Sequence, residues 1–194
     1  APYLHTDPDQ GRPLLEGKKI HQFDYEYGVP TYYFDPSAYE ALAGTDRYIS
    51  DRREKNSGKV KLNCAEYRLV IRRQAASTNE RTLISTVIQP GDLCGDNLEV
   101  SQPFNALGEP MLSPNQLLSL TGILNSFVID FVIRRKVTTN LNKFYLYQLP
   151  VPIEAVEEDE SSWSQAIAAR VARLVCCSDA FEGLWADAWR DEWS

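Results

Sequence analysis

The chain has 194 residues, of which 43% are hydrophobic and 24% are charged, so it is long enough to bury a core as one domain, with or without an appended helical piece. Its net charge is −7, and the excess of acidic residues lies entirely after residue 150. No apolar run reaches the ~18 residues that a transmembrane helix needs, and no signal peptide is visible, so we do not expect a membrane protein. The cysteines form neither a CxxC pair nor a compact disulfide framework, which fits a reducing cytoplasm; they are Cys64, Cys94, Cys176 and Cys177.

The first residues predict a linker followed by a strand. Residues 1–12 are rich in Pro, Asp, Gly and Gln and are expected to be an N-terminal linker, while residues 18–23 alternate polar and apolar side chains as a strand does. Four side chains in this strand carry donors suited to phosphates and base edges: Lys18, Lys19, His21 and Gln22. His21 is equally well explained as a strand residue bonded to the backbone. Because no Cys, Asp or Glu follows at ligand spacing, we do not expect a metal site.

The next stretch predicts packing and surface elements. The aromatic residues between 25 and 34 are expected to pack in a sheet. Residues 36–42 predict a short helix that ends near Gly44, and the charged residues 46–58 predict an exposed helix or a mobile loop.

Two β-rich runs, 67–73 and 82–88, predict paired strands joined by a polar loop. Arginine grips guanine or phosphate with two donors and asparagine reads adenine, so this hairpin suits a DNA-facing position. Its candidate residues are Arg72, Arg73, Ser77, Thr78, Asn79 and Arg81. The alternative is a solvated turn whose side chains bond to their own backbone.

Residues 47–81 hold ten basic and four acidic residues, so a local positive face on an acidic chain is one interpretation and an ordinary mixed surface is the other.

A long helix over residues 114–136 is the organising element of the chain. Ser113 supplies an N-cap and Pro114 a first helical residue, and the apolar residues that follow recur every three to four positions, with Phe127, Val128 and Phe131 expected in the core. Basic and polar residues follow, before a strand predicted at 144–147; they are Arg134, Arg135, Lys136, Thr138, Thr139, Asn140, Asn142 and Lys143. They serve either as C-terminal caps of a buried helix or as contacts to DNA.

The end of the chain predicts an acidic linker and C-terminal helices over residues 153–194. Pro150 and Pro152 set an extended exit, Ser161 or Ser162 caps a helix, and Trp185, Trp189 and Trp193 are expected to pack rather than to bind a ligand. The predicted fold is therefore α+β, with one curved, mostly antiparallel sheet over residues 18–149, the long helix packed on it, and two C-terminal helices.

The sequence holds no catalytic motif. It lacks a P-loop, GxSxG and HExxH, and also the Gly-rich cofactor loop and the Asn/Asp-Pro-Pro-aromatic motif of adenine methyltransferases. We expect this chain to be non-catalytic by itself. Since it begins without methionine and Met111 is its only one, we also expect it to be part of a longer protein.

Three segments resemble a known family. Residues 124–136 read LNSFVIDFVIRRK and precede a Thr/Asn-rich loop and QLPVP, residues 13–28 read PLLEGKKIHQFDYEYG, and residues 67–91 read YRLVIRRQAASTNERTLISTVIQPG. In this order they are similar to the target recognition domains of restriction-modification enzymes. The likeness is to the C-terminal specificity domain of adenine-specific DNA methyltransferase-endonucleases of the TaqI-like type, and more distantly to type I specificity subunits.

The resemblance implies a target recognition domain at residues 13–152 that binds double-stranded DNA. It also implies an N-terminal methyltransferase domain of the same chain, which would hold S-adenosylmethionine. If the resemblance holds, the three segments with candidate donors should converge on one face. The alternative function is an acidic protein-interaction module that docks a partner subunit without binding DNA.

Overall fold

The computed structural model describes residues 3–43, 49–53, 60–105, 108–156 and 162–189, and it confirms the predicted α+β class with C-terminal helices. The strands are β1 (Leu4–His5), β2 (Arg12–Pro13), β3 (Tyr33–Phe34), β4 (Ile49–Arg53), β5 (Val60–Leu62), β6 (Arg68–Arg72), β7 (Ser85–Ile88) and β8 (Leu98–Val100). The helices are α1 (Ala38–Ala43), α2 (Pro114–Leu124), α3 (Phe127–Arg134), α4 (Lys143–Leu146), α5 (Ser162–Val175) and α6 (Glu182–Ala188). These strands pair antiparallel, but they form three small sheets instead of one continuous sheet.

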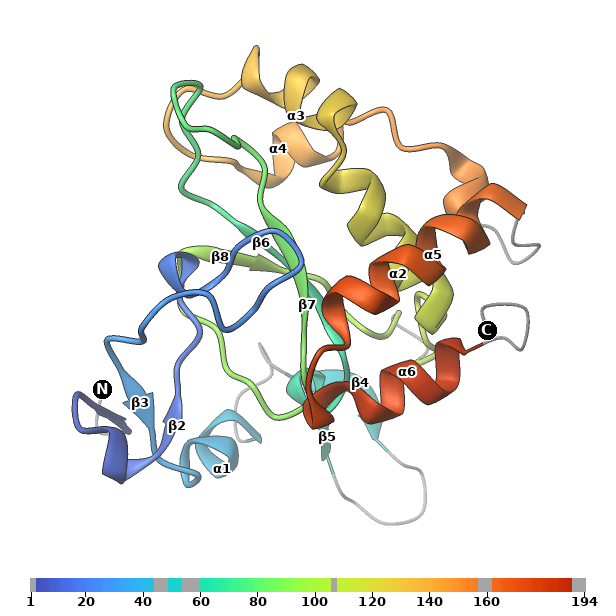
Figure 1. Cartoon of the computed structure of the whole chain (residues 1–194). Helices are drawn as coiled ribbons and strands as arrows, with labels where there is room; N and C mark the ends of the chain where they lie inside the picture. Colours follow the sequence, from blue (N-terminus) through green and yellow to red (C-terminus); the bar gives the residue numbers. More distant parts are fainter. Residues whose placement is uncertain (1–2, 44–48, 54–59, 106–107, 157–161, 190–194) are drawn as a thin grey trace.

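The core is built on the sheet in which β6 lies between β7 and β8 (Figure 1). Leu69 lies opposite Val87, and all of β7 and the first four residues of β6 are buried. Continuous aliphatic and β-branched runs are typical of strands buried on both faces, which is why the two strands were predictable from the sequence. α2 packs against both β6 and β7 and covers the sheet.

The N-terminal residues form a sheet of their own. β3 pairs with β1 and with β2, so residues expected in an N-terminal linker are strands of the fold. Arg12 ties this sheet to the turn after β7, because its Nη2 lies 3.2 Å from Oδ1 of the buried Asp92, whose backbone oxygen accepts a bond from Arg68. Burial raises the pKa of Asp92 to about 6.

The strand expected at residues 18–23 is wrong. Gly17–Lys19 is a 3₁₀ turn, and His21 and Asp24 close a tight turn in which the N–H of each donates to the carbonyl of the other, at 2.7 and 3.2 Å. Phe23 has a φ of 63°, which no extended strand allows. Ile20 and Phe23 are three residues apart, and this spacing suits a turn better than the period of two in a strand.

Of two further predictions for residues 36–58, one is confirmed and the other is wrong for the residues that the structure describes. The helix predicted at 36–42 is present as α1. Of the stretch 46–58, expected as an exposed helix or mobile loop, Ile49–Arg53 is strand β4, paired with β5, and residues 46–48 and 54–58 lie outside the described residues.

The long helix is broken where the sequence reads Asn125-Ser126. α2 begins with a capping box between Ser113 and Gln116, and α3 begins at its own N-cap, Ser126, with a bend of 57° between the two helices. In the described part of the chain no single helix is long and apolar enough to cross a membrane, although this bent pair together would be. The bend turns the outer face of α3 away from the core.

Because of this bend, an expectation about which residues of α3 lie in the core is wrong. Ile129 and Ile133 are buried, but Phe127, Val128 and Phe131, which we expected inside, are 82%, 69% and 62% exposed. The strand expected at 144–147 is likewise wrong, because Lys143–Leu146 is one helical turn, α4, that begins after Asn142. A short apolar run without a neighbouring strand to pair with does not distinguish helix from strand.

The C-terminal helices pack on α2 (Figure 1). Gly122 allows this close approach, since a Cβ there would lie 2.6 Å from Ile167 and 2.7 Å from Val171 of α5. The rings of Trp185 and Trp189 lie 5.2 Å apart, consistent with packing, and Trp193 lies outside the described residues. Residues 162–189 therefore share the main core.

Candidate nucleic-acid interface

Two of the three polar segments predicted from the sequence lie side by side. The N–H of Ala75 donates to the carbonyl of Thr139 at 3.0 Å, and the N–H of Leu141 donates to the carbonyl of Arg73 at 2.7 Å. Gln74 and Asn140 form an antiparallel bridge between the same stretches. We call residues 72–81 and 134–143 the paired loops; they lie at the end of the molecule that carries α3 and α4 (Figure 1).

Arg134 holds the hairpin in place. Its guanidinium donates to the carbonyls of Ser77 and Asn79, both at 2.7 Å, and of Glu80 at 2.8 Å, and to Asp130 Oδ2 at 2.9 Å. Four acceptors occupy this side chain. Arg134, expected as a DNA contact, is instead a positioning residue within the protein.

Asp130 fixes the other side of the hairpin, although the sequence analysis did not select it. Its Oδ1 accepts bonds from the N–H groups of Thr82 at 2.8 Å and Leu83 at 2.9 Å. Burial alone would raise the pKa of Asp130, but these bonds and the Arg134 guanidinium lower it overall. An acidic residue inside an apolar helical stripe is a signal for such a buried, bonded carboxylate.

Asn125 connects the third segment to the other two. Gln22 Nε2 and the Arg81 guanidinium both donate to the carbonyl of Asn125, and the N–H of Phe23 donates to the carbonyl of Ser85 at 3.1 Å. Gln22 and Arg81 thus meet at Asn125, which joins two of the three predicted segments, and the paired loops join the other two; that all three segments present their donors on one face stays a prediction. No sequence pattern identified Asn125 as the residue that joins them.

Several predicted donors are exposed and several are not. Lys19 is 8% exposed, so the expectation of a solvent-exposed donor there is wrong. Gln22, Arg73 and Arg81 are half-buried and have partners within the protein: Gln22 and Arg81 on Asn125, and Arg73 on Asp96 at 3.2 Å and Glu99 at 3.3 Å. The exposed candidates are Lys18, Ser77, Thr78, Arg135, Lys136, Thr138, Thr139, Asn140, Asn142 and Lys143. His21, Arg72 and Asn79 are half-buried.

The paired loops hold more basic than acidic side chains, although Asp96, Asp130 and Glu99 beside them pair with three of the basic ones. Their twenty residues hold seven basic side chains and one acidic one, in a chain whose net charge is −7. Lys143 is 4.0 Å from Glu99, and Lys136 donates to Gln148 at 3.1 Å, so both ammonium groups have only weak or neutral partners. Such a local field attracts phosphate even on an acidic protein.

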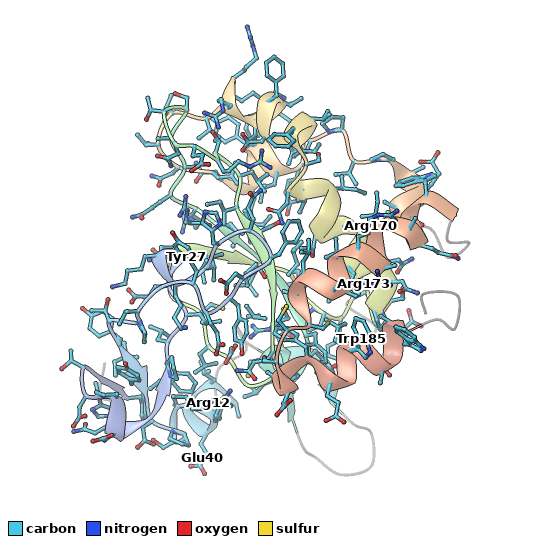
Figure 2. All side chains as sticks on the ribbon, in the orientation of Figure 1. Arg12, Tyr27, Glu40, Arg170, Arg173 and Trp185 are labelled. Carbon is cyan, nitrogen blue, oxygen red and sulfur yellow. The ribbon has the colours of Figure 1, made fainter. Side chains whose placement is uncertain are left out.

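Tyr27 lies near Arg72, the first residue of the paired loops. Burial lowers the pKa of the Arg72 guanidinium, whose Nε has no bonding partner among the described residues and whose electrostatic neighbour is Tyr27. Tyr27, labelled in Figure 2, is 64% exposed. Its ring lies 4.7 Å from that of His21. The aromatic stretch was expected to pack in a sheet, so the exposed Tyr27 was missed.

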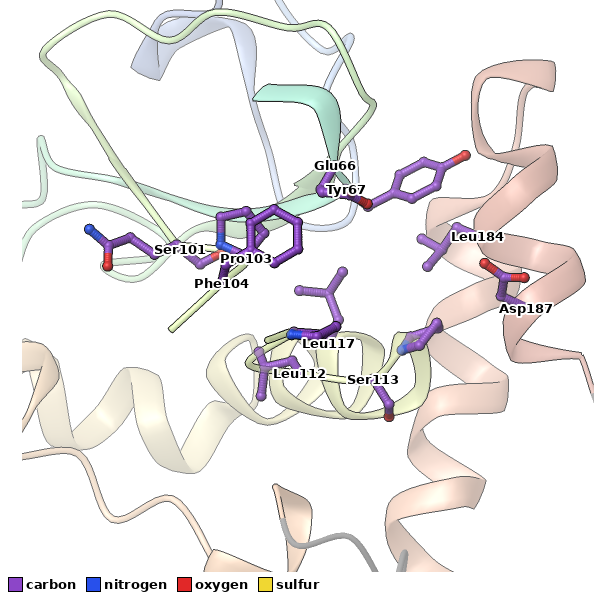
Figure 3. Close-up of a pocket in the computed structure, with 13 residues that line it drawn as sticks. Glu66, Tyr67, Ser101, Pro103, Phe104, Leu112, Ser113, Leu117, Leu184 and Asp187 are labelled. Carbon is purple, nitrogen blue, oxygen red and sulfur yellow. The ribbon is translucent and has the colours of Figure 1, made fainter. Parts of the chain in front are cut away.

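A pocket of about 280 Å³ lies at the far end of α2 (Figure 3). Phe104, Leu117 and the start of α2 line it, together with the two acidic residues Glu66 and Asp187, and none of the described residues around it is basic. With 11 residues at ~1.5 Å each, α2 places its ends about 16 Å apart. The pocket is therefore separate from the paired loops and does not suit a polyanion.

No group of three side chains suited to hold a metal ion occurs in the described residues. Comparison of the chain with protein-family models, curated proteins and solved structures found no match. The functional argument therefore depends on the geometry and charge of the paired loops.

Proposed function

We propose that this chain is the DNA sequence-recognition module of a larger, cytoplasmic restriction-modification enzyme, an adenine-specific DNA methyltransferase with or without endonuclease activity. In this proposal the module is non-catalytic. Double-stranded DNA is its partner, and S-adenosylmethionine binds to a methyltransferase domain that precedes the module in the same chain.

The observation that carries the proposal is the pairing of the two loops. Seven basic residues, with hydroxyl and amide side chains between them, are brought into one place by bonds between Ala75 and Thr139 and between Arg73 and Leu141. Arg134 and Asp130 hold the hairpin rigidly, so little conformational entropy would be lost on binding. Lysines would contact phosphates, and exposed amides and hydroxyls would contact base edges.

A second function is favoured by a different observation. α3, α4 and the residue that follows α4 expose large apolar side chains, among them Phe127, Phe144 and Tyr147. Exposed apolar groups of this size are typical of protein interfaces. In this alternative the chain docks a partner subunit and does not bind DNA.

Binding of the 194-residue chain to fluorescent duplex DNA distinguishes the two functions. We expect a dissociation constant of ~10⁻⁴–10⁻⁶ M at physiological salt, because few phosphate contacts are available, and weaker binding as salt rises. Absence of binding at low salt would favour the protein-interaction module. Nanomolar, sequence-specific binding by this chain alone would contradict the expected affinity.

Lys143→Ala should weaken binding to all DNA sequences alike. Its side chain is 67% exposed, and a lysine that contacts a phosphate carries no base information. Between about 50 and 200 mM salt, the slope of log affinity against log salt should fall in magnitude by about 0.9. Arg170→Ala, on the distant surface of α5 (Figure 2), is the matched control and should change neither affinity nor slope.

Asn79→Ala should instead change site preference. Only the backbone carbonyl of Asn79 bonds to Arg134, so truncation of its side chain leaves the hairpin held. Loss of one bidentate base contact should relax preference at one or two positions by about 1–3 kcal/mol, measured as methylation rates of the intact enzyme on matched and single-mismatch sites. Gln102→Ala, exposed beside the pocket, serves as the control; equal effects of the two changes would remove Asn79 from recognition.

A further inference from the structure

The outer face of α3 is apolar and open to solvent. Phe127, Val128 and Phe131 are 82%, 69% and 62% exposed, whereas Ile129 and Ile133 on the inner side are buried. Phe131 follows Val128 by three residues and Phe127 by four, and these spacings place the three exposed side chains on one side of the helix. We call these three residues the α3 outer face.

Each ring of the α3 outer face has an arginine beside it. The guanidinium carbon of Arg81 lies 4.4 Å from the ring centroid of Phe127, and that of Arg135 lies 5.6 Å from the centroid of Phe131. Arg81 is held there by its bond to the carbonyl of Asn125. Aromatic rings and guanidinium planes both stack on nucleobases, and the arginine charge also attracts phosphate.

Area and charge favour a nucleic acid over a protein on this face. Three such side chains expose on the order of 400 Å². A standard protein interface needs about 800 Å² on each partner. The two arginines, and the net positive charge of the paired loops that flank α3, favour an anionic partner with flat apolar surfaces.

We propose that the α3 outer face stacks on unpaired or unstacked bases of DNA, with Arg81 and Arg135 beside the stacked bases and their phosphates. The inference rests on the proposed function and adds a preference that duplex recognition does not require. The chain should bind DNA with a short unpaired stretch more tightly than fully paired DNA of the same length.

Two fluorescent DNAs of equal length test this, one fully paired and one with a central unpaired stretch that contains 2-aminopurine. We expect at least about fivefold tighter binding to the second DNA, together with quenching of 2-aminopurine fluorescence as its base stacks on a ring. The double variant Phe127→Leu, Phe131→Leu keeps an apolar surface but removes both rings. It should lose the preference and the quenching while keeping salt-dependent duplex binding.

Tyr147→Ala is the matched control, because Tyr147 is an aromatic residue at the C-terminal end of α4 that is 83% exposed; this variant should retain the preference. Thermal melting of each variant establishes that it is folded, as expected for changes to exposed side chains. Salt-dependent binding of the wild type to both DNAs with equal affinity would overturn this inference and leave the proposed function intact. Failure to bind either DNA would overturn both.

Two further outcomes would also overturn the stacking role. In the first, the leucine variant keeps the preference for unpaired DNA. In the second, the wild type self-associates in sedimentation experiments and the leucine variant does so equally well. The α3 outer face would then be a contact between copies of the chain, and this contact would depend on apolar area and not on aromatic rings.

Discussion

Replacement of Asp130 with alanine is expected to lower the free energy of unfolding by about 3–5 kcal/mol. The buried carboxylate accepts bonds from the N–H groups of Thr82 and Leu83 and from Arg134. Alanine would leave two buried N–H groups unbonded and remove the one carboxylate that pairs with Arg134 among the described residues. Urea unfolding at neutral pH, followed by circular dichroism, measures the change.

The effect should depend on pH in a defined direction. Burial would raise the pKa of Asp130, but its hydrogen bonds lower it overall, so the folded-state pKa lies below the unfolded value. Its stabilisation is therefore fully present above about pH 4 and is lost as the pH falls through the folded-state pKa. The difference between wild type and variant should shrink in that acidic range.

Asp96→Ala is the control for a carboxylate in an ordinary ion pair. Asp96 is fully exposed and lies 3.2 Å from Arg73, and solvent screening leaves such an exposed pair with little effect on stability. Amide hydrogen exchange of residues 77–80 provides a second measurement, because Asp130 pairs with the Arg134 guanidinium that holds that loop. A loss at Asp130 as small as that at Asp96 would show that the hairpin is held by other contacts.

The elements that the sequence predicted are those whose stabilising interactions are local. β6 and β7 follow from continuous apolar runs on either side of a polar loop, and the start of α2 follows from Ser113 and Gln116, which cap each other. α5 follows from an amphipathic repeat. In each case the periodicity and caps that define the element lie within it.

The failures arise where a distant residue decides the local structure. The helical period continues through Asn125; α2 ends there because Asn125 bonds to Ser85, forty positions away in the chain, and because Ser126 caps the start of α3. Because α3 then starts in a new direction, Phe127 and Phe131 leave the core that the period assigned to them. The prediction for Lys19 fails for a different, local reason, because a turn from Gly17 to Asp24 replaces the expected strand.

The candidate interface was predictable in composition but not in the roles of its residues. Clusters of Arg, Lys, Thr and Asn identified both paired loops from the sequence. That Arg134 positions the hairpin while Lys143 remains exposed depends on four hydrogen bonds that no spacing rule encodes. The sequence therefore locates a candidate interface, and the structure separates the residues that hold the loops in place from those that remain exposed.

Asn125 occupies the position where the helices, β7 and the N-terminal segment meet. Its Nδ2 donates to the carbonyl of Ser85 at 2.8 Å, and its Oδ1 accepts from the N–H of Ser85 at 3.1 Å and from Gln22 at 3.3 Å. The side-chain amide thus bonds both backbone groups of one strand residue, as a neighbouring strand would. An amide can do this because it carries both a donor and an acceptor.

Asn125→Asp is expected to lower the free energy of unfolding by about 3 kcal/mol at pH 7.5, because a buried carboxylate oxygen would face the Ser85 carbonyl and no donor would remain. That unfavourable contact raises the pKa of the new carboxyl in the folded state, so the variant should regain stability relative to wild type as the pH falls towards 5, where a protonated carboxyl donates again. Urea unfolding of both proteins at the two pH values measures this.

Asn142→Asp, the same change at an exposed residue before α4, is the control and should alter stability by less than about 0.5 kcal/mol at either pH. If Asn125→Asp were as stable as wild type at pH 7.5, or its deficit did not change with pH, the pairing between Asn125 and Ser85 would not be what separates α2 from α3.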